Sequence, residues 1–191
     1  MAQIFVEEKT FEKIDFTKNP LEKGEYEYCT FKKCDFSNAD LSGFVFLECD
    51  FSGCNLSLAK LNKTALRGIK FKDSKLMGLS FDSCNEFGLE LTFNNCTLDH
   101  CSFYQVKLKK TTFKDNRIHQ ADFTEADLSS SVFDNCDLSR TTFENTILEK
   151  ANFTSAYNYT LDPELNRIKK AKFSMAGISG LLAKYDIDIK E

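Results

Sequence analysis

The sequence contains few of the residues that interrupt regular structure. Its 191 residues include no Trp, two Pro and eight Gly, whereas Phe occurs 19 times. This scarcity of Gly and Pro excludes a collagen-like or low-complexity chain. So many Phe side chains need a regular buried place, and the length favours one folding unit that is large enough to enclose them.

Long apolar runs are also absent. The segment after Met1 has no basic stretch followed by a long apolar one, and no segment approaches the roughly 18 apolar residues that a membrane span requires. We therefore expect a cytoplasmic protein that does not enter a membrane. The net charge of −4 comes with Lys and Arg dispersed along the chain, so we expect no direct binding of nucleic acid, which needs a basic stripe.

Apolar residues recur at every fifth position in two long series. Calling each of these positions i, the residue at i−2 is usually small or a Cys, and the other three are mostly polar. Chance would give such an unbroken pattern with a probability on the order of 10⁻¹¹. The two series are Phe11, Phe16, Leu21, Tyr26, Phe31, Phe36, Leu41, Phe46, Phe51, Leu56, Leu61, Leu66, Phe71, Leu76, Phe81, and Phe93, Leu98, Phe103, Leu108, Phe113, Ile118, Phe123, Leu128, Phe133, Leu138, Phe143, Leu148, Phe153.

Neither an α-helix nor a flat strand keeps a five-residue period on one face, whereas a coil with four short straight sides does. The motifs at 39–42 (ADLS), 121–124 (ADFT) and 126–129 (ADLS) resemble those of the pentapeptide-repeat family, over about residues 9 to 156. The resemblance implies an all-β fold: a right-handed quadrilateral parallel β-helix, or solenoid. We assign the repeat domain to residues 1–156.

Four pentapeptides per coil place residues 20 apart on top of each other. The two series differ in phase by two residues, which predicts a two-residue insertion near 85–90, within the segment Asn85–Gly88. With this correction one side of the rod consists of Phe alone, and coils about 4.8 Å apart give a rod near 40 Å long. The predicted ladder is Phe11, Phe31, Phe51, Phe71, Phe93, Phe113, Phe133, Phe153, Phe173.

The residues that most often carry chemistry fit structural roles. All eight Cys occupy the i−2 position, which predicts buried, reduced thiols rather than disulfides or metal ligands. His100 and His119 are expected on the surface without a carboxylate partner, and Asn116 at i−2 is expected to bond to the coil backbone. No catalytic motif is present, so we expect no enzyme activity, no catalytic residues, no cofactor and no metal.

The charged residues distribute unevenly over the sides of the rod. Several Asp at i−1 are expected to hold turns by accepting backbone hydrogen bonds. On the side that contains Phe81, Phe103, Phe123 and Phe143, however, the outward positions carry carboxylates without Lys or Arg at equivalent positions. We predict that this acidic wall binds a partner, and it comprises Asp82, Asp122, Glu125 and Glu144.

Residues 157–191 are expected to form the last coil, a short capping helix and a dimerisation tail. Ser174 can cap the helix, and the alternating segment 186–189 has the pattern of an edge strand. This end resembles the end of the quinolone-resistance subgroup of pentapeptide-repeat proteins, which implies a head-to-head homodimer. The apolar residues expected at the dimer contact are Met175, Ile178, Leu181, Leu182 and Tyr185.

Two functions remain open at this point. The resemblance implies a protein that imitates duplex DNA and protects DNA gyrase and topoisomerase IV, since a basic DNA-binding surface attracts an acidic rod. The alternative is a protein-interaction scaffold with a different protein partner. The outward apolar residues that favour the scaffold are Val45, Leu47, Leu58, Met77 and Tyr104.

Overall fold

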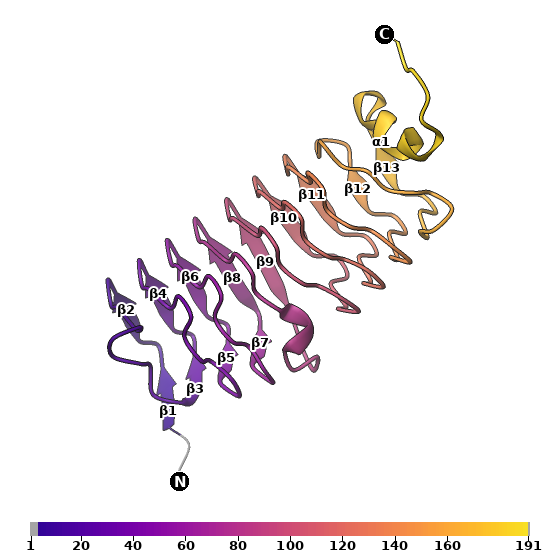
Figure 1. Cartoon of the computed structure of the whole chain (residues 1–191). Helices are drawn as coiled ribbons and strands as arrows, with labels where there is room; N and C mark the ends of the chain where they lie inside the picture. The colour runs from indigo at the N-terminus through magenta and orange to yellow at the C-terminus, as the bar shows by residue number, and fades with distance from the viewer. Residues whose placement is uncertain (1–3, 191) are drawn as a thin grey trace.

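A computed structural model describes residues 4–190 as a rod of stacked coils with a helical segment at its C-terminal end (Figure 1). Each coil contributes short strands, and successive coils add to the same sheets. The strands are β1 (Ile4–Glu7), β2 (Thr10–Glu12), β3 (Gly24–Glu27), β4 (Thr30–Lys32), β5 (Val45–Leu47), β6 (Asp50–Ser52), β7 (Ala65–Arg67), β8 (Ile69–Lys72), β9 (Leu91–Asn94), β10 (Thr112–Lys114), β11 (Val132–Asp134), β12 (Asn152–Phe153) and β13 (Lys172–Phe173).

All the strand pairs are parallel. One sheet has the order β1-β3-β5-β7, and a nine-stranded sheet runs β13-β12-β11-β10-β9-β8-β6-β4-β2 along the rod. Paired residues are 20 apart, as in Phe11 with Phe31, but Phe71 pairs with Phe93, 22 residues later. Since Ala65 still pairs with Asn85, the two extra residues lie between Asn85 and Leu91. The predicted fold class, a parallel β-solenoid of the pentapeptide-repeat type, is confirmed.

The rod has four faces, which we number by their inward residues. Face 1 contains the Phe ladder from Phe11 to Phe173. Face 2 contains Phe16, Phe36, Leu56, Leu76, Leu98, Ile118 and Leu138. Face 3 contains Leu21, Leu41, Leu61, Phe81, Phe103, Phe123 and Phe143. Face 4 contains Val6, Tyr26, Phe46, Leu66, Leu108, Leu128, Leu148 and Ile168.

Aromatic rings form continuous stacks inside the rod. Along face 1 the neighbouring ring centroids lie 4.7 to 5.6 Å apart. In the second half the rings of face 3 stack at 4.6 to 5.4 Å and meet those of face 1 edge to face. Each buried ring contributes about 1.5–3 kcal/mol through burial, so these stacks are the main source of stability.

The corners of the coil follow from the backbone. Residues at i+2, such as Lys110, Glu125 and Lys150, have positive φ and turn the chain from one face to the next. Aspartates at i−1 hold the turns as predicted: the Oδ1 of Asp40 and of Asp127 each accept a hydrogen bond from the backbone N–H two residues later. The outward carboxylates therefore divide into those that hold a turn and those that are free.

Residues at i−2 point inward and bond to the neighbouring coil. The thiols of Cys49 and Cys136 donate to carbonyl oxygens 23 residues earlier, at 3.3 Å in both cases. Asn116 donates to the Phe93 carbonyl and accepts from the Cys96 N–H, as expected for a buried amide. All eight thiols are free and seven are buried; the exception is Cys84, beside the insertion, which is half-buried.

The expected short capping helix is divided into three short helical turns. It consists of η2 (Met175–Gly177), α1 (Ser179–Leu182) and η3 (Ala183–Tyr185), and Ser174 Oγ accepts a hydrogen bond from the Gly177 N–H as the predicted cap. The prediction of an edge strand over 186–189 is wrong, because these residues form no strand and expose Ile187 and Ile189. None of the helices among residues 4–190 has the length and apolar character needed to span a bilayer.

Candidate protein-binding faces

The four residues of the acidic wall lie on face 3, on three separate coils. Asp82 belongs to the turn η1 (Phe81–Ser83), and the backbone N–H of Glu125 bonds to the Glu144 carbonyl at 2.8 Å, so these two residues are neighbours on adjacent coils. Asp82, Glu125 and Glu144 are exposed, whereas Asp122 is half-buried. The coil geometry therefore keeps three of the four carboxylates available to a partner.

Asp122 has a structural task. Its Oδ1 accepts a hydrogen bond from the Thr124 backbone N–H at 2.9 Å, the same turn contact that other i−1 aspartates make. Glu125 instead accepts a side-chain bond at 2.7 Å from Gln105, one coil earlier. Asp122 thus contributes charge to the wall while its carboxylate shapes the backbone.

The wall is interrupted by a coil without carboxylates. Tyr104 and Gln105 occupy the outward positions between Asp82 and Asp122, and Tyr104 is exposed. Beside them a depression of about 290 Å³ is lined by Asp82, Tyr104, Glu86 and Lys107, with the Lys107 Nζ 3.8 Å from a Glu86 oxygen. A partner would therefore meet an aromatic ring and an amide between the acidic groups.

Face 3 carries two further carboxylates in the last coil, Asp162 and Glu164, which are not among the predicted wall residues. Lys184 binds Asp162 at 2.8 Å and Glu164 at 2.7 Å. These hydrogen bonds from Lys184 lower the pKa of both carboxyl groups and raise the pKa of the lysine. Lys184 lies outside the repeat, so the five-residue period gave no signal that Asp162 and Glu164 would be neutralised.

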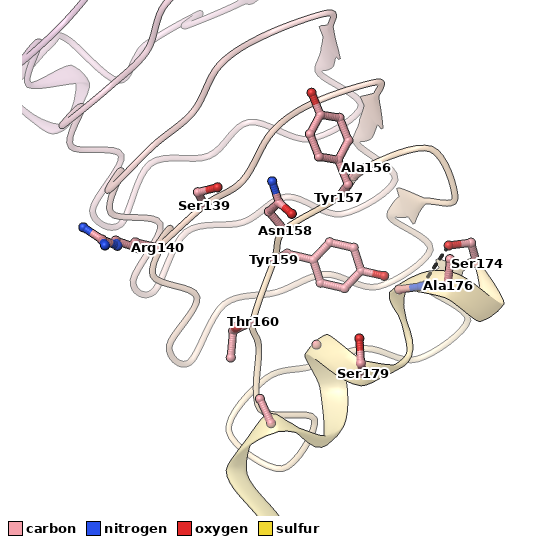
Figure 2. A pocket seen from close by; sticks show the side chains of 13 residues that line it. Ser139, Arg140, Ala156, Tyr157, Asn158, Tyr159, Thr160, Ser174, Ala176 and Ser179 are labelled. Atoms are coloured by element: carbon pink, nitrogen blue, oxygen red, sulfur yellow. Dashed lines mark hydrogen bonds between the residues drawn. The ribbon is translucent and has the colours of Figure 1, made fainter. Parts of the chain in front are cut away.

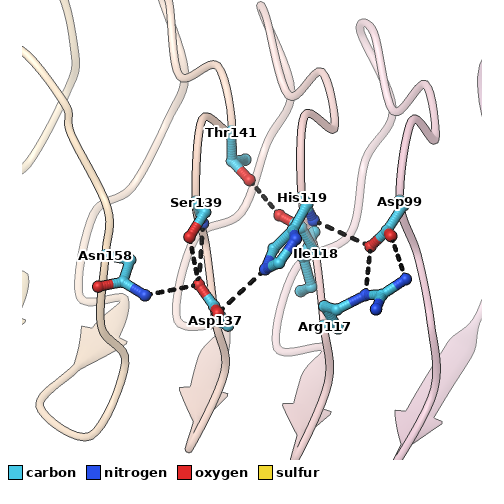
Figure 3. Close-up of polar contacts among 8 residues, drawn as sticks. All are labelled: Asp99, Arg117, Ile118, His119, Asp137, Ser139, Thr141 and Asn158. Carbon is cyan, nitrogen blue, oxygen red and sulfur yellow. Dashed lines mark hydrogen bonds and ion pairs between the residues drawn. The ribbon is translucent and has the colours of Figure 1, made fainter.

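Face 2 carries a ladder of polar contacts that runs from Asp99 to Asn158 across four coils (Figure 3). Arg117 forms a bidentate ion pair with Asp99, and the Nε2 of His119 lies 3.0 Å from an oxygen of Asp137. The expectation that His119 has no carboxylate partner is wrong, whereas His100 is exposed as expected. Across residues 4–190, no group of three or more His, Cys, Asp or Glu side chains is arranged to hold a metal ion.

The five residues expected at the dimer contact differ in their surroundings. Met175 is 85% exposed and Tyr185 is also exposed, whereas Ile178, Leu181 and Leu182 are half-buried. Leu181 packs against the core of the rod. It therefore covers the end of its own rod, and Met175 is the member most available to a second copy.

A depression of about 780 Å³ lies between the last coils and the helical segment (Figure 2). Tyr159 is buried at its edge, and among the described residues its hydroxyl has no hydrogen-bond partner. A Cβ atom at Gly177 or Gly180 would come within 2.1 Å of Tyr159 atoms, so glycine permits the close packing of helix and rod. The lining is mostly small and polar, with Arg140 as its charged member, and it contains no paired nucleophile and base.

The repeat geometry agrees with the family comparison. Residues 29–85 match the model described as pentapeptide repeats (8 copies), and residues 88–153 match the model described as a pentapeptide repeat region. The boundary between these matches falls in the segment where the strand register shifts. The chain belongs to the pentapeptide-repeat family.

Solved structures share the whole architecture. A trypsin-treated form of QnrB1, a plasmid-mediated fluoroquinolone resistance protein, matches with a TM-score of 0.63 and 20% identity, covering 98% of each chain. Full-length QnrB1 matches with a TM-score of 0.62 and 21% identity, covering 97% of this chain and 100% of that one. At this identity the likeness establishes the fold. No curated protein matches the sequence.

Proposed function

We propose that this protein is a non-enzymatic, cytoplasmic rod that binds a type II topoisomerase, DNA gyrase or topoisomerase IV, in place of duplex DNA. The observation that carries this proposal is the acidic wall on face 3, where the exposed carboxylates Asp82, Glu125 and Glu144 lie along one side of the rod. A basic DNA-binding surface attracts such a side and orients it. The fluoroquinolone resistance attributed to QnrB1, which has the same fold, supports the choice of partner.

Charge alone supplies only part of the affinity. Duplex DNA carries one negative charge per about 1.7 Å, so a 40 Å length has roughly 24 charges. The acidic wall offers four carboxylates, and Asp162 and Glu164 beyond it are paired with Lys184. Contacts with Tyr104 between the acidic groups must therefore add to the binding, and moderate salt should weaken it without abolishing it.

The proposal is tested by measuring gyrase supercoiling with and without a fluoroquinolone. The test variant carries Asp82→Lys, Glu125→Lys and Glu144→Lys, and it leaves Asp122 to hold its turn. The matched control carries Glu12→Lys, Asp50→Lys and Asp73→Lys on face 1; it has the same change in net charge and also loses one side-chain bond between coils, from Asn95. We expect the parent and the control to protect gyrase and the test variant to lose most of its protection.

The topoisomerase proposal fails if the parent binds no gyrase, or if both triple variants protect equally. In that case the scaffold function is favoured. Its supporting observation is the pair of exposed apolar side chains Leu58 and Met77, which lie on adjacent coils of face 2. A scaffold partner should lose affinity on Leu58→Ser with Met77→Ser and be indifferent to the reversals on face 3.

We further propose that two rods meet end to end through the exposed side of the C-terminal segment. Such a homodimer would align two acidic walls over roughly 80 Å. Leu181→Asp with Leu182→Asp should give a monomer, but Leu181 also packs on its own rod. Met175→Asp is the cleaner change, because this side chain is 85% exposed and its replacement leaves the rod core intact. Sedimentation velocity at about 0.5 M salt, where contacts between charged side chains are screened, should show a dimer for the parent and a monomer for Met175→Asp.

A further inference from the structure

The two halves of face 4 carry opposite charge. In the first half, the outward positions of β1, β3, β5 and β7 and of the corners after them hold five carboxylates and one cation, Arg67. Within residues 4–190 none of the five carboxylates forms an ion pair with a cation. The carboxylates are Glu7, Glu8, Glu25, Glu27 and Glu48.

The second half of face 4 is basic. Seven cations face outward there, against the two carboxylates Asp127 and Glu149, which are occupied by Lys109 and Arg167. Dispersed along the sequence, these cations are gathered on one surface by the 20-residue repeat of the coil. They are Lys107, Lys109, Lys110, Lys150, Arg167, Lys169 and Lys170.

Within each half the like charges stack on one another. The backbone N–H of Glu8 bonds to the Glu27 carbonyl at 2.9 Å, and that of Lys150 bonds to the Lys169 carbonyl at 3.0 Å. Side chains at this spacing repel when they carry the same charge, and the repulsion lowers the stability of the isolated rod. A bound surface of opposite charge would relieve it in both halves at once.

The two halves are arranged symmetrically about the insertion. Glu7 and Glu8 lie on the first coil and Lys169 and Lys170 on the last, while Glu25 and Glu27 lie one coil inward and Lys150 one coil inward from the other end. The coil halfway between them contains Phe87, whose side chain is 74% exposed and lies over the Arg67 guanidinium. A two-fold axis through this coil brings the first two coils, which carry four of the five carboxylates, opposite the last two, which carry Lys150, Lys169 and Lys170, and it buries Phe87 beside its own copy. The attraction comes from these end coils, because nearer the axis Glu48 meets the coil of Asp127 and Arg67 meets the coil of Lys107.

We propose that face 4 binds a second copy of this chain side by side and antiparallel, through this two-fold axis. A second copy is the occupant that the charges favour, because it has the same length and the reversed order of charge. A nucleic acid would be attracted by the second half and repelled by the first. The contact is isologous, so each rod supplies one acidic and one basic half.

The expected association is weak and depends on salt. A face roughly 40 Å long and about 13 Å wide buries about 1,000 Å² in total, below the area of most stable complexes. Its ion pairs are exposed at the rim and screened by salt. This contact is separate from the end-to-end contact at Met175, so the two dimers can be tested independently.

Charge reversal gives a test in which two broken surfaces repair each other. One variant carries Glu7→Lys, Glu8→Lys and Glu27→Lys; the other carries Lys150→Glu, Lys169→Glu and Lys170→Glu. Both have Met175→Asp as background, so that the end-to-end contact is removed. All the changed positions face outward, and both Lys and Glu occur elsewhere in the chain at the i+1 and i+2 positions of the coil, as Lys32, Lys33, Glu48 and Glu144 do.

Sedimentation velocity from about 1 to 100 μM, at about 0.05 and 0.5 M salt, measures the outcome. At low salt we expect the Met175→Asp parent to dimerise, each charge variant to bind itself at least tenfold more weakly, and an equimolar mixture of the two variants to form heterodimers. High salt should dissociate every pair. Small-angle scattering of the Met175→Asp parent should show a dimer no longer than one rod. This measurement can be interpreted without the charge variants.

A parent background that stays monomeric at low salt, a mixture that does not associate, or a dimer twice the length of the rod would each overturn the proposal. None of these results depends on gyrase, so the side-by-side contact stands or falls separately from the topoisomerase function.

Discussion

The repeat rod and the C-terminal segment bury their apolar residues to very different degrees. In the middle of the rod Phe93, Phe113 and Phe133 have no exposed surface, because each ring has a stacked neighbour on both sides. At the end Phe173 is half-buried and stacks on Phe153 alone. A solenoid therefore gains stability from each neighbouring coil, and its last coil needs a substitute for the neighbour that it lacks.

The substitute is built from Tyr159, Leu161 and the helical segment. Tyr159 and Leu161 are buried, and Leu181 reaches over the end of the core. Most of the helical segment stays half-buried or exposed, and it is anchored by Lys184 with Asp162 and Glu164 at the surface. The comparison indicates that the end is held by a few specific contacts, whereas the rod is held by many equivalent ones.

The largest difference should appear in the Phe ladder. Phe113→Ala should lower the free energy of unfolding by about 3–5 kcal/mol, because it leaves a cavity between two rings. Phe173→Ala should cost about 1–2 kcal/mol, because part of its ring is already in water. Denaturant unfolding of both variants measures the difference, and equal losses would contradict the gradient of burial along the ladder.

Gly180→Ala should have an intermediate effect confined to the end of the rod. The new Cβ would lie 2.1 Å from the carbonyl oxygen of Tyr159 and 3.1 Å from its ring, so the helical segment must move away at a cost of about 1–3 kcal/mol. Backbone amides around 159–182 should lose their protection from hydrogen exchange, whereas those in the rod should keep theirs. The control is Ser179→Ala, which changes an exposed residue one position earlier and should leave the stability and the exchange protection unchanged. Loss of protection throughout the rod would show that the rod and the helical segment do not unfold separately.

The rod could be predicted from the sequence because one short-range rule repeats. Inward positions, the Phe ladder, the i−2 thiols and the backbone bonds of Asn116 all follow from the five-residue period. The departures are local compensations. Phe44, for example, occupies an i−2 position that is usually small, and the preceding coil carries Gly24 in the same column, where no side chain competes for space.

The surface was less predictable because it depends on how flexible side chains meet. The five-residue period places Asp137 and His119 on face 2, but it does not predict that the two side chains approach each other. It also does not predict that Lys184 reaches Asp162. The opposite charge of the two halves of face 4 had a readable signal, the spacing of Lys110, Lys150 and Lys170 by multiples of 20 residues. This signal was hidden because Lys and Arg look evenly dispersed when they are counted along the chain.

The smallest expected effect concerns Asp137, which joins the rod to the C-terminal segment. Desolvation opposes its ionisation, but hydrogen bonds from Ser139, His119 and Asn158 outweigh this and lower the pKa of the carboxyl to about 2. The bond from Asn158 at 3.0 Å reaches across to the last coil. Asp137→Asn should therefore reduce stability by about 1 kcal/mol at neutral pH, because an amide oxygen accepts more weakly than a carboxylate.

The pH dependence of this loss gives the sharpest check. A carboxyl whose pKa is lower in the folded state than its unfolded value of about 3.9 stabilises the fold above that value, and the contribution disappears as the pH falls towards 2. The difference between the parent and Asp137→Asn should thus shrink below about pH 4 in denaturant unfolding curves. Asp40→Asn is the matched control: Asp40 holds the same kind of turn through Ser42, but it lies far from the C-terminal segment. If Asp137→Asn costs no more than Asp40→Asn, or its cost does not change with pH, the carboxylate does not help to fasten the segment to the rod.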